Sequence, residues 1–127
     1  MQTMQNNKKI LIVDDSEDMR TLLGQVLEDE GYALFFAEDG DIAISQAIAH
    51  HPNVILMDMS LPGMSGWEAV EHLRKLPDFQ YTSIIAVTAY VSKADEEHAK
   101  AVGCDVHLGK PFDIVQVLDT IDALLQK

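Results

Sequence analysis

Five short, mostly apolar runs, separated by longer amphipathic stretches, constrain the fold of this chain more than any other feature of its sequence. The runs lie at residues 10–13, 33–37, 54–57, 84–87 and 106–108. A strand with one face in water alternates apolar and polar residues, whereas a strand covered on both faces is apolar throughout. The runs therefore predict a parallel sheet covered by helices on both faces.

The stretches between the runs predict helices. In the first stretch the apolar residues follow helical spacing, at Met19, Leu22, Leu23, Val26 and Leu27, and residues 114–125 repeat this pattern. Gly31 is suited to end the first helix. Asp39, Ser65 and Ser92 are suited to begin the second, third and fourth helices, and the fourth ends before Gly103. The fourth helix has few apolar residues, so we expect it to be the most loosely held.

Five strand-then-helix units in series predict an α/β fold of the flavodoxin-like, doubly wound type, (βα)5. Its five parallel strands would lie in the order 2-1-3-4-5, with right-handed crossovers. In this order strands 1 and 3 flank the point where the winding reverses. We therefore expect ligands to bind at the carboxyl ends of these two strands.

Length and composition agree with one soluble domain. The 127 residues, 47% apolar and 24% charged, can bury a core without metal or disulfide support. The single cysteine, Cys104, cannot form an internal disulfide, which is typical of a reducing compartment. No targeting signal and no apolar run of membrane-spanning length is visible, so the sequence predicts a cytoplasmic protein without a membrane partner.

The charge balance excludes some partners. Nine Lys and Arg face 21 Asp and Glu, for a net charge of −12. Such a field repels nucleic acid and anionic lipid, and it favours metal cations and basic protein surfaces. Solubility alone explains an acidic excess equally well, so the position of the acids decides what they indicate.

Polar and charged residues stand just after four of the predicted strands. Asp14 and Asp15 follow the first strand, Asp58 the third, Thr88 the fourth and Lys110 the fifth. The ends of parallel strands meet at one edge of the sheet, where three carboxylates repel each other unless a cation is present. Oxygen ligands of this kind suit Mg²⁺. The alternative is that the acids only cap loops and helices.

These residue types together suit phosphoryl transfer. Asp58 would be the nucleophile and form an aspartyl phosphate. The Lys110 ammonium, the Thr88 hydroxyl and Mg²⁺ would share the charge of the phosphoryl oxygens.

The same residues resemble the signature of the bacterial two-component response regulator receiver domains, the chemotaxis-Y-like type. The resemblance rests on the Asp14-Asp15 pair, residues 57–66 (MDMSLPGMSG), Thr88-Ala89 and residues 110–112 (KPF). It extends from about Lys8 to Leu125. Residues 8–127 are therefore predicted to form the receiver domain, after a polar extension at residues 1–7.

The resemblance implies roles for individual residues. Asp58 corresponds to the phosphoacceptor. The Mg²⁺ ligands would be Asp58, Asp15, Asp14 partly through water, and the backbone carbonyl of Ser60. Thr88 and Lys110 would contact the phosphoryl oxygens.

Three further residues, Ala89, His107 and Pro111, belong to the switch and partner-binding face that the resemblance implies. The small Ala89 leaves the approach to Asp58 open, and the Lys110-Pro111 bond is expected to be cis. His107 departs from the family, which usually has Tyr or Phe there as an aromatic that swings inward. The imidazole is smaller than these rings and polar. His107 is either an exposed residue of a short edge strand or a modified switch and partner contact.

The resemblance implies a stand-alone switch that takes a phosphoryl group from a histidine kinase or a histidine phosphotransfer protein. It would catalyse only its own phosphorylation and dephosphorylation, and would signal to an unidentified downstream protein as a monomer or weak dimer. One alternative is a phosphorylation-independent interaction module, although such modules typically lose an acid, the acceptor or the lysine. A dehalogenase-type hydrolase would require Asp-x-Asp, but Ser60 stands at its second acid.

Overall fold

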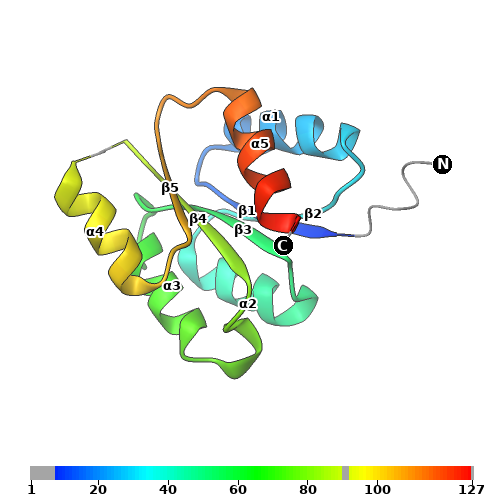
Figure 1. Ribbon diagram of the computed structural model, residues 1–127. Helices are drawn as coiled ribbons and strands as arrows, with labels where there is room; N and C mark the ends of the chain where they lie inside the picture. Colours follow the sequence, from blue (N-terminus) through cyan, green and yellow to red (C-terminus); the bar gives the residue numbers. More distant parts are fainter. Residues whose placement is uncertain (1–7, 90–91, 127) are drawn as a thin grey trace.

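Strands and helices alternate along the whole described chain (Figure 1). The computed structural model describes residues 8–89 and 92–126, so the predicted extension at residues 1–7 lies outside the described part. The strands are β1 (Lys9–Val13), β2 (Ala33–Ala37), β3 (Val54–Asp58), β4 (Ser83–Thr88) and β5 (Val106–Gly109). The helices are α1 (Glu17–Asp29), α2 (Gly40–His50), α3 (Gly66–Arg74), α4 (Lys93–Val102) and α5 (Ile114–Leu125), with a short 3₁₀ turn, η2 (Pro77–Phe79), after α3.

The five strands form one parallel sheet in the order β2-β1-β3-β4-β5. Helices α1 and α5 cover one face, and α2, α3 and α4 cover the other (Figure 1). This confirms the predicted flavodoxin-like fold. Within residues 8–89 and 92–126, no helix is both long and apolar enough to cross a membrane.

The sheet separates two apolar cores. One lies under α2, α3 and α4 and includes Ile55, Met57 and Phe79, whereas the other lies under α1 and α5 and includes Ile12, Leu27 and Ile121. The central strands β1, β3 and β4 are buried almost throughout, as their solid apolar runs predicted. The prediction was wrong for β2, because this edge strand has a neighbour on one side only and leaves Ala33 and Phe36 exposed.

The predicted helix starts are confirmed by side-chain caps. Asp39 Oδ1 accepts a hydrogen bond from Ile42 N at 2.8 Å. Ser65 and Glu68 form a reciprocal capping box, and Ser92 Oγ accepts from Asp95 N at 3.1 Å. Each cap satisfies a backbone N–H that has no partner within its helix.

Helix α4 is held by little apolar surface, because only Ala99 and Val102 are buried among its residues. One further contact reaches it from α3, where the indole of Trp67 stacks on the imidazole of His98 with ring centroids 4.1 Å apart and planes 13° from parallel. Directly after α4, Gly103 at φ 112° ends the helix in a left-handed conformation that suits glycine. Arg74 Nε donates to the Gly103 carbonyl at 2.9 Å, and its guanidinium pairs with Asp105 at 3.0 Å.

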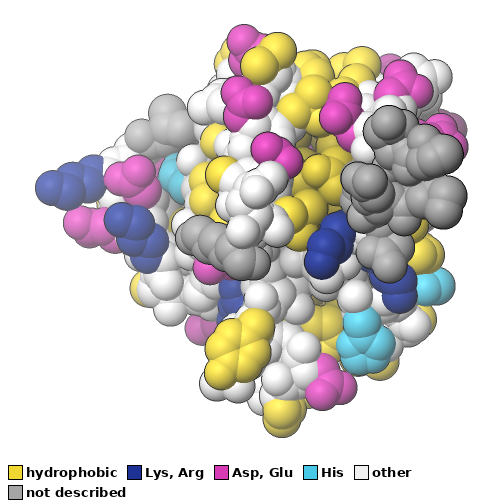
Figure 2. Space-filling view, turned by 45° about the vertical axis from the view of Figure 1, so that its right-hand side comes forward, with side chains coloured by type: hydrophobic (Ala, Val, Ile, Leu, Met, Phe, Trp, Pro, Cys, Tyr) yellow, Lys and Arg dark blue, Asp and Glu magenta, His cyan; other side chains and the backbone are white. Residues whose placement is uncertain are grey.

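Acidic side chains are scattered over the face shown in Figure 2 rather than gathered in one patch. Apolar side chains lie between them on this face. A dispersed distribution of this kind is also the one expected of charges that keep a protein soluble.

Cys104 belongs to the buried core, and burial raises the pKa of its thiol from the ordinary value of 9.0 to about 12. The folded state therefore keeps the thiol proton to higher pH than the unfolded chain does. This contribution to stability is complete below the unfolded pKa and is lost as the pH rises toward 12. We expect the free energy of unfolding to fall less steeply between pH 8.5 and 10.5 in Cys104→Ala than in the unaltered protein. Urea unfolding at several pH values measures this slope, and equal slopes would contradict the prediction.

Candidate functional site

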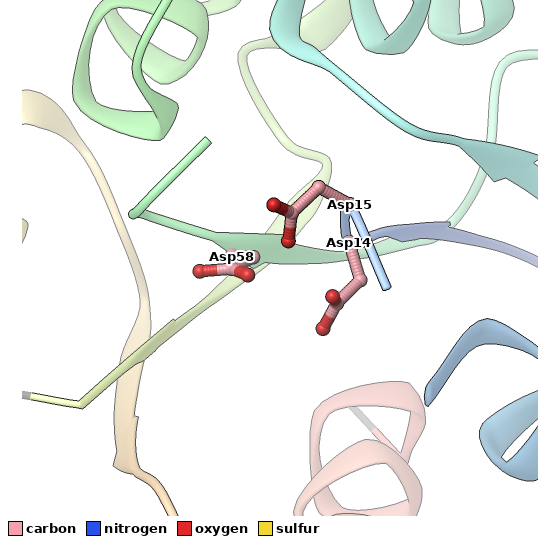
Figure 3. Close-up of side chains that lie close together, drawn as sticks. All are labelled: Asp14, Asp15 and Asp58. Atoms are coloured by element: carbon pink, nitrogen blue, oxygen red, sulfur yellow. The ribbon is translucent and has the colours of Figure 1, made fainter. Parts of the chain in front are cut away.

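Three carboxylates meet at the carboxyl ends of β1 and β3. Asp14 and Asp15 follow β1, and Asp58 is the last residue of β3. Each offers a carboxylate oxygen, and the three oxygens lie within 4.8 Å of one another. Figure 3 shows the three side chains projecting into a common region beyond the sheet edge. The structure thus brings together the acids that the sequence predicted to converge.

The members of the cluster differ in exposure. Asp14 is 4% exposed and Asp58 is 3% exposed, whereas Asp15 is open to solvent. Thr88, at the end of β4, is 2% exposed, and the next residue, Ala89, is exposed. Two buried carboxylates with one exposed carboxylate at the rim form a shallow acidic site that solvent can reach.

Lys110 reaches the acids from the loop after β5. Its Nζ lies 3.1 Å from Asp58 Oδ2 and 3.5 Å from Asp14 Oδ2. Its backbone N–H donates to the Thr88 carbonyl at 2.8 Å, which fixes the start of the loop against β4. The Lys110-Pro111 peptide bond is cis, as expected. Lys110 therefore bridges the two buried carboxylates.

Backbone N–H groups hold both buried carboxylates in place. Asp14 Oδ1 accepts from Ser16 N at 2.9 Å, and Asp58 Oδ1 accepts from Ser60 N at 2.9 Å. The second oxygen of each carboxylate faces Lys110. The Ser60 side chain itself is exposed.

Two residues of the site were missed by the sequence reasoning. Arg20 of α1 donates from Nη1 to the Asp14 carbonyl at 2.6 Å. Gly66 packs α3 against the end of β3 so closely that a Cβ there would lie 2.5 Å from the Asp58 carbonyl and 2.6 Å from Met59 Sδ. Only glycine allows this approach without a shift of the backbone.

The charges of the site act on one another. Burial raises the pKa of the Asp14 carboxyl, the charges of Asp58 and Asp15 add to this, and the Ser16 hydrogen bond and Lys110 oppose it. Burial disfavours the Lys110 ammonium, but the hydrogen bond with Asp58 and the charges of Asp58 and Asp14 together raise the pKa of Lys110 above its ordinary value. Lys110 thus stays charged at neutral pH, and the carboxylates are crowded enough to favour a further cation.

His107 lies on β5 opposite Ala86 of β4. It is half-buried, and its Nε2 is buried without a hydrogen-bond partner. It borders a hollow of about 250 Å³ beside α4, together with Glu96 and Lys100. His107 is therefore not simply a solvated edge residue, and a switch role stays a prediction.

The comparisons with known proteins agree with this geometry. The family model described as the response regulator receiver domain matches residues 10–122. The polar-differentiation response regulator DivK of Brucella ovis is 35% identical over 118 residues, covering 93% of this chain and 96% of the relative.

Solved structures give the same result. The chemotaxis response regulator CheY4 of Vibrio cholerae superposes with a TM-score of 0.89 at 33% identity, over 94% of this chain and 99% of that one. The receiver domain of the sensor histidine kinase PA1611 of Pseudomonas aeruginosa superposes with a TM-score of 0.87 at 27% identity, over 95% and 99%, and has a magnesium ion coordinated in its active-site cleft. The chain therefore belongs to the family of response regulator receiver domains, the signalling modules of two-component systems.

Proposed function

We propose that this chain is a phosphorylation-dependent signalling switch that accepts a phosphoryl group on Asp58. The observation that carries the proposal is the position of Asp58. It is a buried carboxylate at the end of β3, 3.1 Å from the Lys110 ammonium and within the cluster formed with Asp14 and Asp15. An interaction module without this chemistry has no need for an acid cluster bridged by a lysine.

The transfer takes place between Asp58 and a phosphohistidine of a histidine kinase or a histidine phosphotransfer protein. An Asp58 carboxylate oxygen forms a bond to phosphorus, and the bond from phosphorus to the imidazole nitrogen breaks. The electron pair of that bond returns to the imidazole. Lys110 offsets the charge on the phosphoryl oxygens, and the hydroxyl of Thr88, at the neighbouring strand end, would donate to them.

The residues present fit a magnesium ion. Asp15, Asp58 and the Ser60 backbone carbonyl would bind it, with Asp14 partly through water, and these are the oxygen donors that Mg²⁺ prefers. When bound, the ion supplies positive charge that draws the carboxylates and the phosphoryl oxygens together. The magnesium in the PA1611 receiver supports this assignment.

The proposal is tested by intact-mass measurement after incubation with acetyl phosphate. We expect one phosphoryl adduct in the presence of Mg²⁺ and none after chelation with EDTA. The adduct is expected to decay in buffer, because an acyl phosphate hydrolyses. A chain that gives no adduct with acetyl phosphate, phosphoramidate or a phosphorylated kinase would instead be a phosphorylation-independent module.

The output of the switch is altered affinity for another protein. The scattered negative charge supports a protein effector rather than nucleic acid. We propose that the chain acts in the cytoplasm as a monomer or weak dimer.

His107 is proposed as a switch and partner-contact residue of the face that also includes Ala89 and Pro111. Its unpartnered Nε2 beside the hollow at α4 supports this role, because a buried polar atom gains a hydrogen bond if a new partner arrives. Once an effector is known, His107→Ala should change its affinity more in the phosphorylated than in the unphosphorylated state. Calorimetric titration of both states measures the difference, and equal changes would contradict the switch role.

A further inference from the structure

A groove with an exposed aromatic ring at its centre lies at the carboxyl end of the edge strand β2, between the first turns of α1 and α2. Phe36 lies at its centre and is 39% exposed. Hollows of about 300 and 220 Å³ border this side chain. The other residues of this β2-end groove are Glu17, Arg20, Thr21, Ala37, Glu38 and Ile42.

The Phe36 ring packs against the protein on one side. Phe36 pairs with Ile12 of β1, whose side chain belongs to the core under α1, and the ring packs against α1 at Gly24. A Cβ at Gly24 would lie 3.0 Å from the ring, so the absence of a side chain at Gly24 leaves room for the Phe36 ring. An aromatic ring that is fixed on one side and open on the other loses little conformational entropy when a partner covers it.

The groove suits side chains rather than an added strand. The Gln46 side chain donates to the Phe36 carbonyl at 3.1 Å, so this acceptor of the edge strand is already satisfied. Ile42, 38% exposed on the first turn of α2, extends the apolar surface beyond Phe36. An apolar side chain that projects from a helix could fill either hollow.

The charge of the groove indicates the chemistry of its occupant. Glu17 and Glu38 line it, and Asp41 is exposed beside Ile42. Arg20 is the single basic residue of the groove, and its Nη1 donates to the Asp14 carbonyl. Three acids against one basic residue leave the surroundings of the apolar centre net negative, which is complementary to an apolar side chain flanked by basic residues.

We propose that the β2-end groove binds an amphipathic helix of a partner protein that presents an apolar side chain between Lys or Arg residues. The occupant would lie beside the acid cluster, because Asp14 N donates to the Ala37 carbonyl at 3.1 Å. The proposal does not depend on phosphorylation of Asp58, since no groove residue belongs to the acid cluster.

The test uses three synthetic peptides of equal length and the full chain labelled with ¹⁵N. The first peptide has a leucine face flanked by lysines, the second replaces each lysine by glutamate, and the third replaces each leucine by serine. We expect the leucine–lysine peptide to shift amide resonances of residues 17–24 and 36–42 most strongly. We expect each of the other two peptides to bind at least about tenfold more weakly than the leucine–lysine peptide, because one loses the charge match and the other loses the apolar contact.

Matched variants separate this groove from general attraction to an acidic protein. Phe36→Ser is expected to weaken binding about tenfold, whereas Ile48→Ser, which alters a side chain that is 49% exposed on α2 outside the groove, is expected to leave it unchanged. The double variant Glu17→Gln/Glu38→Gln leaves the ring in place and should also weaken binding. Amide shifts centred elsewhere, or equal affinities of Phe36→Ser and Ile48→Ser, would overturn the proposal.

Discussion

Replacing Asp58 with asparagine is expected to abolish the phosphoryl adduct that acetyl phosphate and Mg²⁺ form on the unaltered chain. The amide has the size of the carboxyl group and can still accept the hydrogen bond from Ser60 N, so the loop should keep its geometry. The amide oxygen is a far weaker nucleophile than a carboxylate. The substitution also removes one of the two buried negative charges of the site, so it lowers the repulsion between the carboxylates of the folded protein. Intact-mass measurement over time follows the adduct.

The matched control is Asp15→Asn. Asp15 is exposed and would bind Mg²⁺ without itself attacking phosphorus. This variant should still form the adduct, but it should require a higher Mg²⁺ concentration. A full adduct on Asp58→Asn would place the acceptor at another residue and contradict the proposed function.

Replacing Lys110 with methionine is expected to slow phosphoryl transfer to Asp58 by about a hundredfold or more, because one fixed positive charge is lost from the transition state. The same change should strengthen Mg²⁺ binding. Lys110 now offsets the charges of Asp14 and Asp58, from 3.5 and 3.1 Å, and therefore competes with any other cation. Without it, two buried carboxylates attract the metal more strongly.

Two measurements separate these effects. Calorimetric titration gives the Mg²⁺ affinity, and the rate of adduct formation at saturating Mg²⁺ gives the transfer step. Lys75→Met serves as control, because Lys75 is an exposed residue that caps the carboxyl end of α3 and is not the lysine that pairs with the acid cluster. If Mg²⁺ bound more weakly to Lys110→Met, the lysine would be organising the metal site rather than competing with the metal.

Much of the fold could be predicted because each strand and helix start carries a local signal. The uninterrupted apolar runs of β1, β3 and β4 indicate burial on both faces. Ser65 and Ser92 indicate helix starts, because each side chain accepts a hydrogen bond from the backbone N–H only three residues later. The exposure of β2 could not be read in the same way. Its run is as apolar as the others, and only the order of strands in the sheet places it at an edge.

The candidate site was predictable to the extent that its residues follow strands directly. Asp14, Asp58 and Lys110 converge because parallel strands end at one edge. Arg20 and Gly66 act through a helix that approaches the site, and the distance of that approach is not encoded in any local pattern. The same holds for the buried nitrogen of His107, which depends on how α4 covers β5.

The stacking of Trp67 on His98 also gives the chain a built-in optical reporter. Trp67 is the only tryptophan, so the intrinsic emission of the protein at indole wavelengths comes from one known position. That position joins the first turn of α3, where Gly66 packs closely against Asp58, to α4, a helix with only two buried residues. A displacement of α4 that separates the two rings changes the environment of the indole, so the movement can be followed by fluorescence in the unlabelled protein.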